Sequence, residues 1–247
     1  TKDDVVRTAR RGIRVLGRVY TFDRQNLKFT GEEFRALARE APADAERGRL
    51  LAALASDAVL KTNGKDEVQP TPLCTMFGQG HQHFLERLVA AVSASDQETE
   101  NALSRTLFSV WRYEDDLSHG FRWDPLEDRR HAYRFGDPSE DRRNATEMGA
   151  NLLAAIGFAA LTTTPTAAGL ATVGVSRRGA ELCVCWPVVA LPTSFAGHVA
   201  LLAHPWLADQ EKAPELGVYG VRAVARARRI QVEKYFNFER ARLQFLA

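Results

Sequence analysis

Residues 170–189 read LATVGVSRRGAELCVCWPVV and decide the fold class of this chain. Two Val-rich apolar runs, residues 170–176 and 181–189, flank the connection Arg177-Arg178-Gly179-Ala180. Apolar runs of this length on either side of a short glycine-containing connection are typical of a β-hairpin. The stretch therefore predicts strands in the C-terminal part of the chain.

Upstream of this hairpin, the apolar residues fall at helical spacing. Residues 3–20 interleave apolar side chains with five arginines and predict an amphipathic helix with one basic face. Thr30 and Glu33 have the spacing of a capping box, which places the start of a second helix there. Asp44 begins a third helix that we expect to continue to Val59. The first sixty residues are thus predicted to be helical.

Further helices are expected on both sides of the irregular, proline-containing stretch 61–80. The patterns place them at residues 81–92 and 99–111, then at 146–161, and finally from a cap at Thr193 or Ser194 to residue 202. Residues 113–144 carry few aliphatic side chains, so we expect an ordered loop or edge strands. From Gly217 onward the pattern fits a helix, with Arg222, Arg226 and Arg229 on one face, and fits an alternating strand as well.

These patterns predict an α+β fold. A helix-rich N-terminal part is followed by a small mixed α/β C-terminal part that contains the hairpin. The expected division is a mainly helical region at 1–112 and a mixed region at 113–247 packed against it, as two domains or as one.

Composition narrows the class of protein. The 247 residues have a net charge of +2 and a hydrophobic fraction of 45%, and the longest apolar stretches are broken by glycine or proline. We therefore expect no membrane span. The three cysteines cannot form a closed set of disulfides, and Cys183 and Cys185 should share one face of a strand, which favours thiols in a reducing cytoplasm.

Catalytic signatures are incomplete. Glu114, Asp116, Asp124 and Asp128 could hold Mg²⁺ for phosphodiester cleavage, but each carboxylate has an arginine within a few residues, so internal pairing is the simpler interpretation. No serine nucleophile motif occurs, and the two histidines at 81 and 83 do not face the same way on a helix. We expect no catalytic residue, no metal and no cofactor.

Three segments have the chemistry of nucleic-acid contact. The paired glycines at 78 and 80 precede an expected helix start and could let a backbone approach closely. Elsewhere, arginines lie among aromatic residues, which suits phosphate contacts and base stacking. The competing interpretations are a simple tight loop and solvent-facing arginines. The candidate nucleic-acid-binding residues are Gln79, His81, Gln82, Arg129, Arg130, Arg134, Arg222, Arg226, Arg228 and Arg229.

Several motifs occur in an order that carries a family resemblance. They are PLCTMFGQGHQHFL at 72–85, RWDPLEDRR at 122–130, GANLLA at 149–154, and Arg228-Arg229-Ile230 followed by Asn237. In this order they resemble CRISPR-associated proteins of type I-G (formerly I-U) systems, in the large-subunit or accessory class of the RNA-guided Cascade effector complex. The resemblance covers roughly residues 70–240.

The resemblance implies a non-enzymatic role in antiviral defence. Such a subunit would help the complex to bind crRNA and target DNA, together with the other effector-complex subunits, and would contribute to reading the protospacer-adjacent motif. Two other functions compatible with the residues are a Mg²⁺-dependent nuclease using the carboxylates at 114–128 and a structural scaffold protein.

Overall fold

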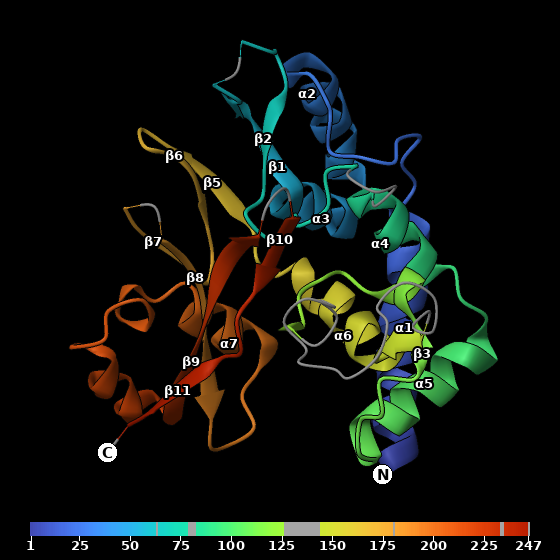
Figure 1. Cartoon of the computed structure of the whole chain (residues 1–247), viewed down its shortest axis with the longest axis vertical. Helices are drawn as coiled ribbons and strands as arrows, with labels where there is room; N and C mark the ends of the chain where they lie inside the picture. Colours follow the sequence, from blue (N-terminus) through green and yellow to red (C-terminus); the bar gives the residue numbers. More distant parts are fainter. Residues whose placement is uncertain (63, 79–82, 126–143, 180, 233–234, 247) are drawn as a thin grey trace.

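The computed structural model describes residues 1–62, 64–78, 83–125, 144–179, 181–232 and 235–246. It shows the expected mixture of helices and antiparallel strands. The helices α1, α4, α5 and α6 lie on one side of the molecule and the largest sheet lies on the other (Figure 1). In the described part of the chain, no helix combines the length and the apolar character that crossing a membrane would require.

The N-terminal region begins as the sequence predicts. α1 (Lys2–Val19) buries one apolar edge, and α2 (Gly31–Glu40) starts at the capping box in which Thr30 accepts from the Glu33 backbone N–H at 3.2 Å. The helix α3 (Ala45–Leu54) is capped by Asp44. It ends before Val59, however, because the chain turns into an extended strand at Ala55.

The prediction that the first sixty residues are helical is therefore wrong for residues 55–60, which form a strand. β1 (Ala55–Leu60) pairs with β2 (Val68–Pro70), and this ribbon packs against α2 and against a later hairpin at residues 163–172. Tertiary pairing overrides the local helical pattern here, since a strand partner lies close by along the chain.

The central helices start and end at other residues than expected. α4 (Phe84–Val92) begins after an extended His83, and α5 (Asp96–Phe108) begins at the Ser95 cap and ends before Trp111. The two-residue strand β3 (Asp115–Asp116) pairs with β4 (Asn144–Thr146) and is followed by the 3₁₀ turn η3 (Leu117–His119). α6 (Met148–Phe158) lies within the expected range and packs against α5.

The predicted hairpin exists, but its strands are divided differently. β7 (Val175–Arg178) pairs with β8 (Glu181–Val189), so Arg177 and Arg178 belong to the strand and not to the connection. The first half of the expected strand belongs instead to β6 (Gly169–Thr172), which pairs with β5 (Thr163–Thr166). A turn at Gly174, whose φ is 71°, separates the two strands.

The C-terminal ambiguity is resolved in favour of a strand. β9 (Val221–Val232) pairs with β8 on one side, and with both β10 (Tyr235–Phe238) and β11 (Arg242–Phe245) on the other. Between β8 and β9 lie α7 (Phe195–Leu202), capped by Ser194 as expected, and the 3₁₀ turns η5 (Pro205–Leu207) and η6 (Ala213–Tyr219).

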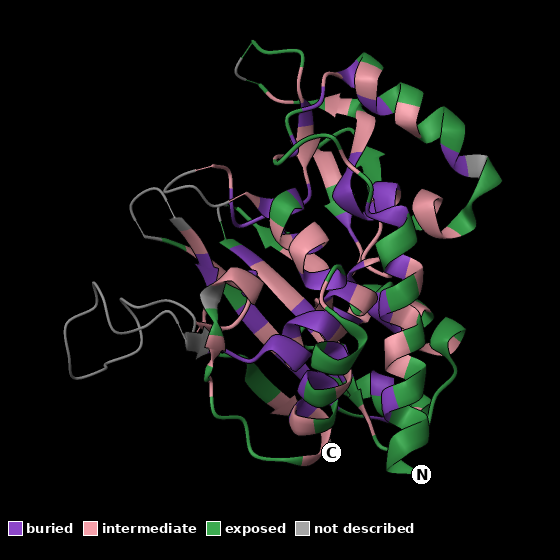
Figure 2. Cartoon of the chain, turned by 90° about the vertical axis from the view of Figure 1, so that its right-hand side faces the viewer, coloured by how far each residue is buried: buried purple, intermediate pink, exposed green. Residues whose placement is uncertain are grey.

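The main hydrophobic core joins the two predicted regions. It contains Leu16, Leu50 and Phe84 from the first 112 residues together with Phe158 and Phe238 from the rest. Figure 2 shows buried residues gathered in the interior of the helical part and along the inner parts of the sheet. A second, smaller cluster lies under α7, η5 and η6 against the other face of β9.

Candidate nucleic-acid interface

Four of the ten predicted binding residues can be placed. Gln79, His81, Gln82, Arg129, Arg130 and Arg134 lie outside the described residues. Arg222, Arg226, Arg228 and Arg229 all belong to β9. Because side chains alternate along a strand, Arg222, Arg226 and Arg228 point to one face of the sheet and Arg229 points to the other.

Arg229 points into the interior. Its guanidinium donates to the backbone carbonyl of Cys74 at 3.3 Å and lies 4.0 Å from the centre of the Phe236 ring. Its Nε is buried without a hydrogen-bond partner, and burial lowers the pKa of Arg229 to about 10. The residue stays charged at neutral pH, but its charge is directed away from the surface.

Arg228 faces the other side and is bound to carboxylates. Its Nε donates to Glu239 at 3.1 Å and a second nitrogen pairs with the same carboxylate, while Glu181 lies at 4.0 Å. The hydrogen bond to Glu239 raises the pKa of Arg228 above its ordinary value. A fork-shaped pair of this kind fixes the guanidinium in one orientation.

Arg226 has only neutral partners. It donates to the Gln244 side chain at 2.6 Å and to the Leu207 carbonyl at 3.1 Å, and its Nε is buried without a partner. Directly across the strand pair, in register with it, lies Arg242 of β11. Like charges opposite one another in an antiparallel pair are destabilising. Within the described residues, no carboxylate pairs with either arginine.

These residues line a groove, which we call the arginine groove. Its volume is about 480 Å³, and its charged walls are Arg226, Arg228, Arg240 and Arg242 together with Glu181, Glu211 and Glu239. Glu181 and Glu239 lie within 4.0 Å of Arg228, whereas no carboxylate among the described residues pairs with Arg226 or Arg242. Positive charge without a carboxylate partner therefore remains at the Arg226–Arg242 pair. Such a surface attracts phosphate groups.

Sequence reasoning missed Arg240 and Arg242. The alternation Arg240-Ala241-Arg242-Leu243 was visible as a strand-like basic pattern. Only the register of β11 with β9, however, brings Arg242 opposite Arg226. The basic pattern at 240–243 was therefore visible in the sequence, but the sequence did not show that Arg242 pairs with Arg226 of another strand.

Two of the four predicted carboxylates accept hydrogen bonds from nearby residues of the chain. Asp116 accepts from the Ser118 backbone N–H at 2.7 Å, and Asp124 accepts from the Tyr113 hydroxyl at 2.8 Å. Glu114 is exposed, and Asp128 lies outside the described residues. Among the residues that are described, no group of three or more histidine, cysteine, aspartate or glutamate side chains is arranged to hold a metal ion.

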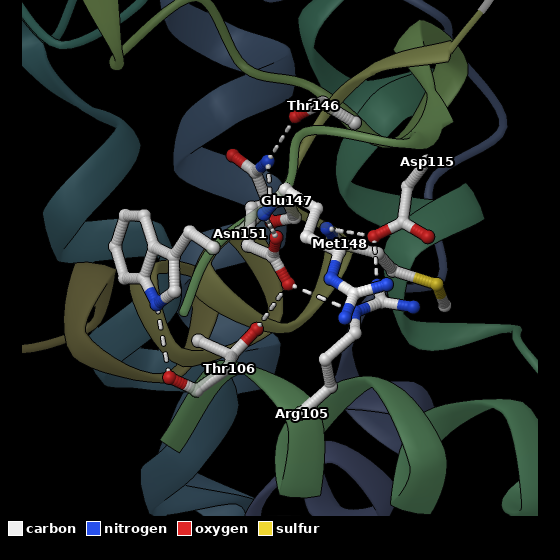
Figure 3. A network of polar contacts seen from close by, with 9 residues as sticks. Arg105, Thr106, Asp115, Thr146, Glu147, Met148 and Asn151 are labelled. Atoms are coloured by element: carbon white, nitrogen blue, oxygen red, sulfur yellow. Dashed lines mark hydrogen bonds and ion pairs between the residues drawn. The ribbon is translucent and has the colours of Figure 1, made fainter. Parts of the chain in front are cut away.

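Two neighbouring carboxylates form a buried network instead. Glu147 is 2% exposed and accepts from Arg105 Nε at 3.2 Å, from the Thr106 hydroxyl at 2.8 Å and from the Arg112 backbone N–H at 3.3 Å (Figure 3). Asp115 pairs with the same Arg105 and accepts from the Met148 backbone N–H at 2.7 Å. This network joins α5 to the start of α6 and engages both oxygens of Glu147 and one oxygen of Asp115, so its role is structural.

The cysteines and the glycine loop also have a structural setting. Burial raises the pKa of Cys74 to about 12, and it also raises the pKa values of Cys183 and Cys185, which share one face of β8 as expected. Gly78 has a φ of 97°, a conformation that favours glycine, at a loop closed by a bridge between Phe77 and His83. α4 begins at Phe84, after an extended His83, and the expected helix start at His81 lies outside the described residues.

Comparison with known proteins finds no relative. No family model matches the chain, and no curated protein or solved structure matches it.

Proposed function

We propose that this chain is a non-enzymatic, nucleic-acid-binding subunit of a type I CRISPR effector complex. In this proposal the arginine groove holds the sugar-phosphate backbone of crRNA or target DNA, and other subunits of the complex complete the path. A contribution to reading the protospacer-adjacent motif is part of the same proposal. Base pairing would supply sequence recognition, while the protein holds backbone and a short motif.

The observation that carries the proposal is the Arg226–Arg242 pair. Two guanidinium groups in register across one strand pair, without a carboxylate partner among the described residues, raise the energy of the free protein. A phosphate placed between them would remove this repulsion and would accept from both planar forks. Arg228, held in place by Glu239, adds a third guanidinium beside that position.

The double variant Arg226→Gln/Arg242→Gln tests the groove. Affinity for a labelled single-stranded oligonucleotide is measured by fluorescence anisotropy across a salt series. Removing two phosphate contacts should weaken binding and should reduce the slope of log affinity against log salt by about 1.4, which is roughly 0.7 for each contact on a single strand. Glutamine keeps much of the side-chain length and hydrogen-bonding capacity, so the fold should be retained.

The matched control is Arg11→Gln/Arg18→Gln, which removes two exposed charges from α1, outside the groove. Its binding curve should lie near that of the unchanged chain. Equal weakening by both double variants would mean that binding depends on overall charge and not on the groove. A chain without salt-dependent affinity for any oligonucleotide would rule out the function.

Membership of an effector complex needs a separate experiment. The tagged chain is purified from its native host, and the co-purifying material is analysed for short RNA and protein subunits. We expect a crRNA of defined length together with other effector subunits. Recovery of the chain alone, at native expression levels and low salt, would contradict this part of the proposal.

A further inference from the structure

A cleft separates α6 from the sheet because both facing surfaces carry small side chains. On α6, Ala150, Ala154 and Gly157 follow one another at spacings of four and three residues and so share a helix face. Opposite them lies Ala227 of β9. A Cβ added at Gly157 would meet no atom within 4 Å, so this end of the helix face borders open space.

We call this space the aromatic cleft. It has two adjacent parts of about 620 Å³ and about 400 Å³, and Trp123, Ala154, Trp186 and Ala227 line both. Trp111 and Tyr113 form the wall of the larger part. Aromatic rings and small apolar side chains line the larger part together with carboxylate, amide and guanidinium groups.

The rings of the cleft are held in fixed positions. The indole N–H of Trp111 donates to the Thr106 carbonyl at 2.9 Å, and that of Trp123 donates to the Leu73 carbonyl at 2.8 Å. Trp123 is stacked on Phe121 and on Phe158 as well. The indole N–H of Trp186, by contrast, has no hydrogen-bond partner in the described part of the chain. Trp186, which lines both parts of the cleft, therefore supplies an aromatic ring whose indole N–H is not used by the described residues.

The aromatic cleft adjoins the arginine groove at the edge of the sheet. Trp186 and Ala227 belong to one face of the sheet, while Arg226 and Arg228 belong to the other. The connection between β10 and β11 passes along the edge between these faces, where the Glu239 backbone N–H donates to the Arg228 carbonyl at 2.8 Å. Glu239 and Arg240 line both the groove and the cleft. A single-stranded nucleic acid whose backbone lies in the groove would therefore have to cross only this connection to place a base in the cleft.

We propose that the aromatic cleft accepts an unpaired base of a single-stranded nucleic acid whose backbone lies in the arginine groove. This inference rests on the proposed function. Proteins that hold single strands combine a basic groove with aromatic side chains on which bases stack. An apolar ligand would use the rings but not the adjoining arginines, whereas a nucleotide strand uses both. The donor of Trp186 suits a carbonyl oxygen or ring nitrogen of a base.

The test distinguishes the contribution of the bases to binding from the contribution of the phosphates. The chain is titrated with an oligothymidylate of about 16 nucleotides and with an oligomer of the same length that carries abasic sites throughout. Tryptophan fluorescence and anisotropy are followed together. We expect the abasic oligomer to bind about tenfold more weakly and to leave the tryptophan emission unchanged, while oligothymidylate quenches it. Oligouridylate and oligodeoxyuridylate, which differ only in the 2′-hydroxyl, show whether the strand is RNA or DNA, and quenching by the one that binds more tightly supports the inference.

Two variants act on the cleft in opposite ways. Trp186→Ala removes a ring, and Gly157→Leu places a side chain into open space. Each should lower oligothymidylate affinity about tenfold and leave binding of the abasic oligomer unchanged. Phe245→Ala is the matched control, because Phe245 is an aromatic residue of the same sheet, is 77% exposed and lines neither cavity. Thermal unfolding followed by circular dichroism checks that each variant is folded.

The outcomes distinguish this inference from the function on which it rests. If the abasic oligomer binds as tightly as oligothymidylate, and the groove variants still weaken both, the groove holds backbone and the base inference is wrong. If Trp186→Ala fails to fold, the Gly157→Leu variant alone tests the inference, because this substitution removes no existing contact. Absence of binding by either oligomer overturns both proposals.

Discussion

At the scale of single residues, Arg229 shows how a basic motif can be misread. Its neighbours Arg226 and Arg228 line a groove on one face of the sheet, yet Arg229 lies on the opposite face beneath Cys74 and Phe236. A buried cation with one carbonyl partner and one ring loses much of its hydration and recovers only part of that free energy. The lowered pKa of Arg229 expresses the same cost.

We predict that Arg229→Met raises the free energy of unfolding by about 1 kcal/mol, since an apolar side chain of similar length avoids the desolvation cost. Urea denaturation measures the change. The control is Arg228→Met, which removes an exposed ion pair and should change the free energy of unfolding little. A clear loss of stability in Arg229→Met would mean that the carbonyl and ring contacts outweigh desolvation.

At the scale of elements, the contact between α5 and α6 depends on one glycine. A Cβ built on Gly149 would lie 2.3 Å from both the Ala102 carbonyl oxygen and the Thr106 hydroxyl. The two helices therefore approach closely at the same point where Thr106 donates to Glu147 (Figure 3). Gly157, two turns further along α6, has no such neighbour.

We predict that Gly149→Ala lowers the free energy of unfolding by about 3 kcal/mol, because the helices must separate or shift to admit the methyl group. Gly157→Ala on the same helix should instead raise it by up to about 1 kcal/mol through helix propensity. Thermal or urea unfolding of the two variants gives the comparison. Similar effects from both would show that helix propensity, and not the close approach, governs this helix.

At the scale of the whole molecule, carboxylates with lowered pKa values are distributed over the fold. Capping hydroxyls lower the pKa values of Asp4 and Glu98, the Thr30 backbone N–H lowers that of Glu33, and Arg14 lowers that of Asp96. A group whose pKa is lower in the folded state stabilises the fold above its unfolded pKa. That stabilisation disappears as pH falls through the folded pKa.

We therefore predict a constant urea midpoint from about pH 7 to about pH 5, followed by a progressive fall below about pH 4. The ordinary pKa values of 3.8 and 4.5 for the aspartates and glutamates mark the top of this window. Ser95→Ala removes the hydroxyl that does most to lower the pKa of Glu98, and it should flatten the acid limb. A midpoint that falls between pH 7 and pH 5 would require a different set of titrating groups.

The sequence by itself determined the features that depend on neighbours along the chain. The capping boxes and caps at Thr30, Asp44 and Ser194 begin helices where they were predicted, because a cap is made within one turn. The shared face of Cys183 and Cys185 follows from strand alternation alone. The α+β class was predictable for the same reason, since helical and alternating patterns are local.

Only the tertiary structure decided the features that depend on partners in other elements. Residues 55–60 become a strand because β2 is available to pair with them, and the expected strand at 170–176 divides because its halves pair with β5 and with β8. The register of β11 on β9 places Arg242 opposite Arg226, and the packing of one face of β9 against the core leaves Arg229 inside. Hydrogen-bond register between strands is a long-range property, and the pattern within one segment does not contain it.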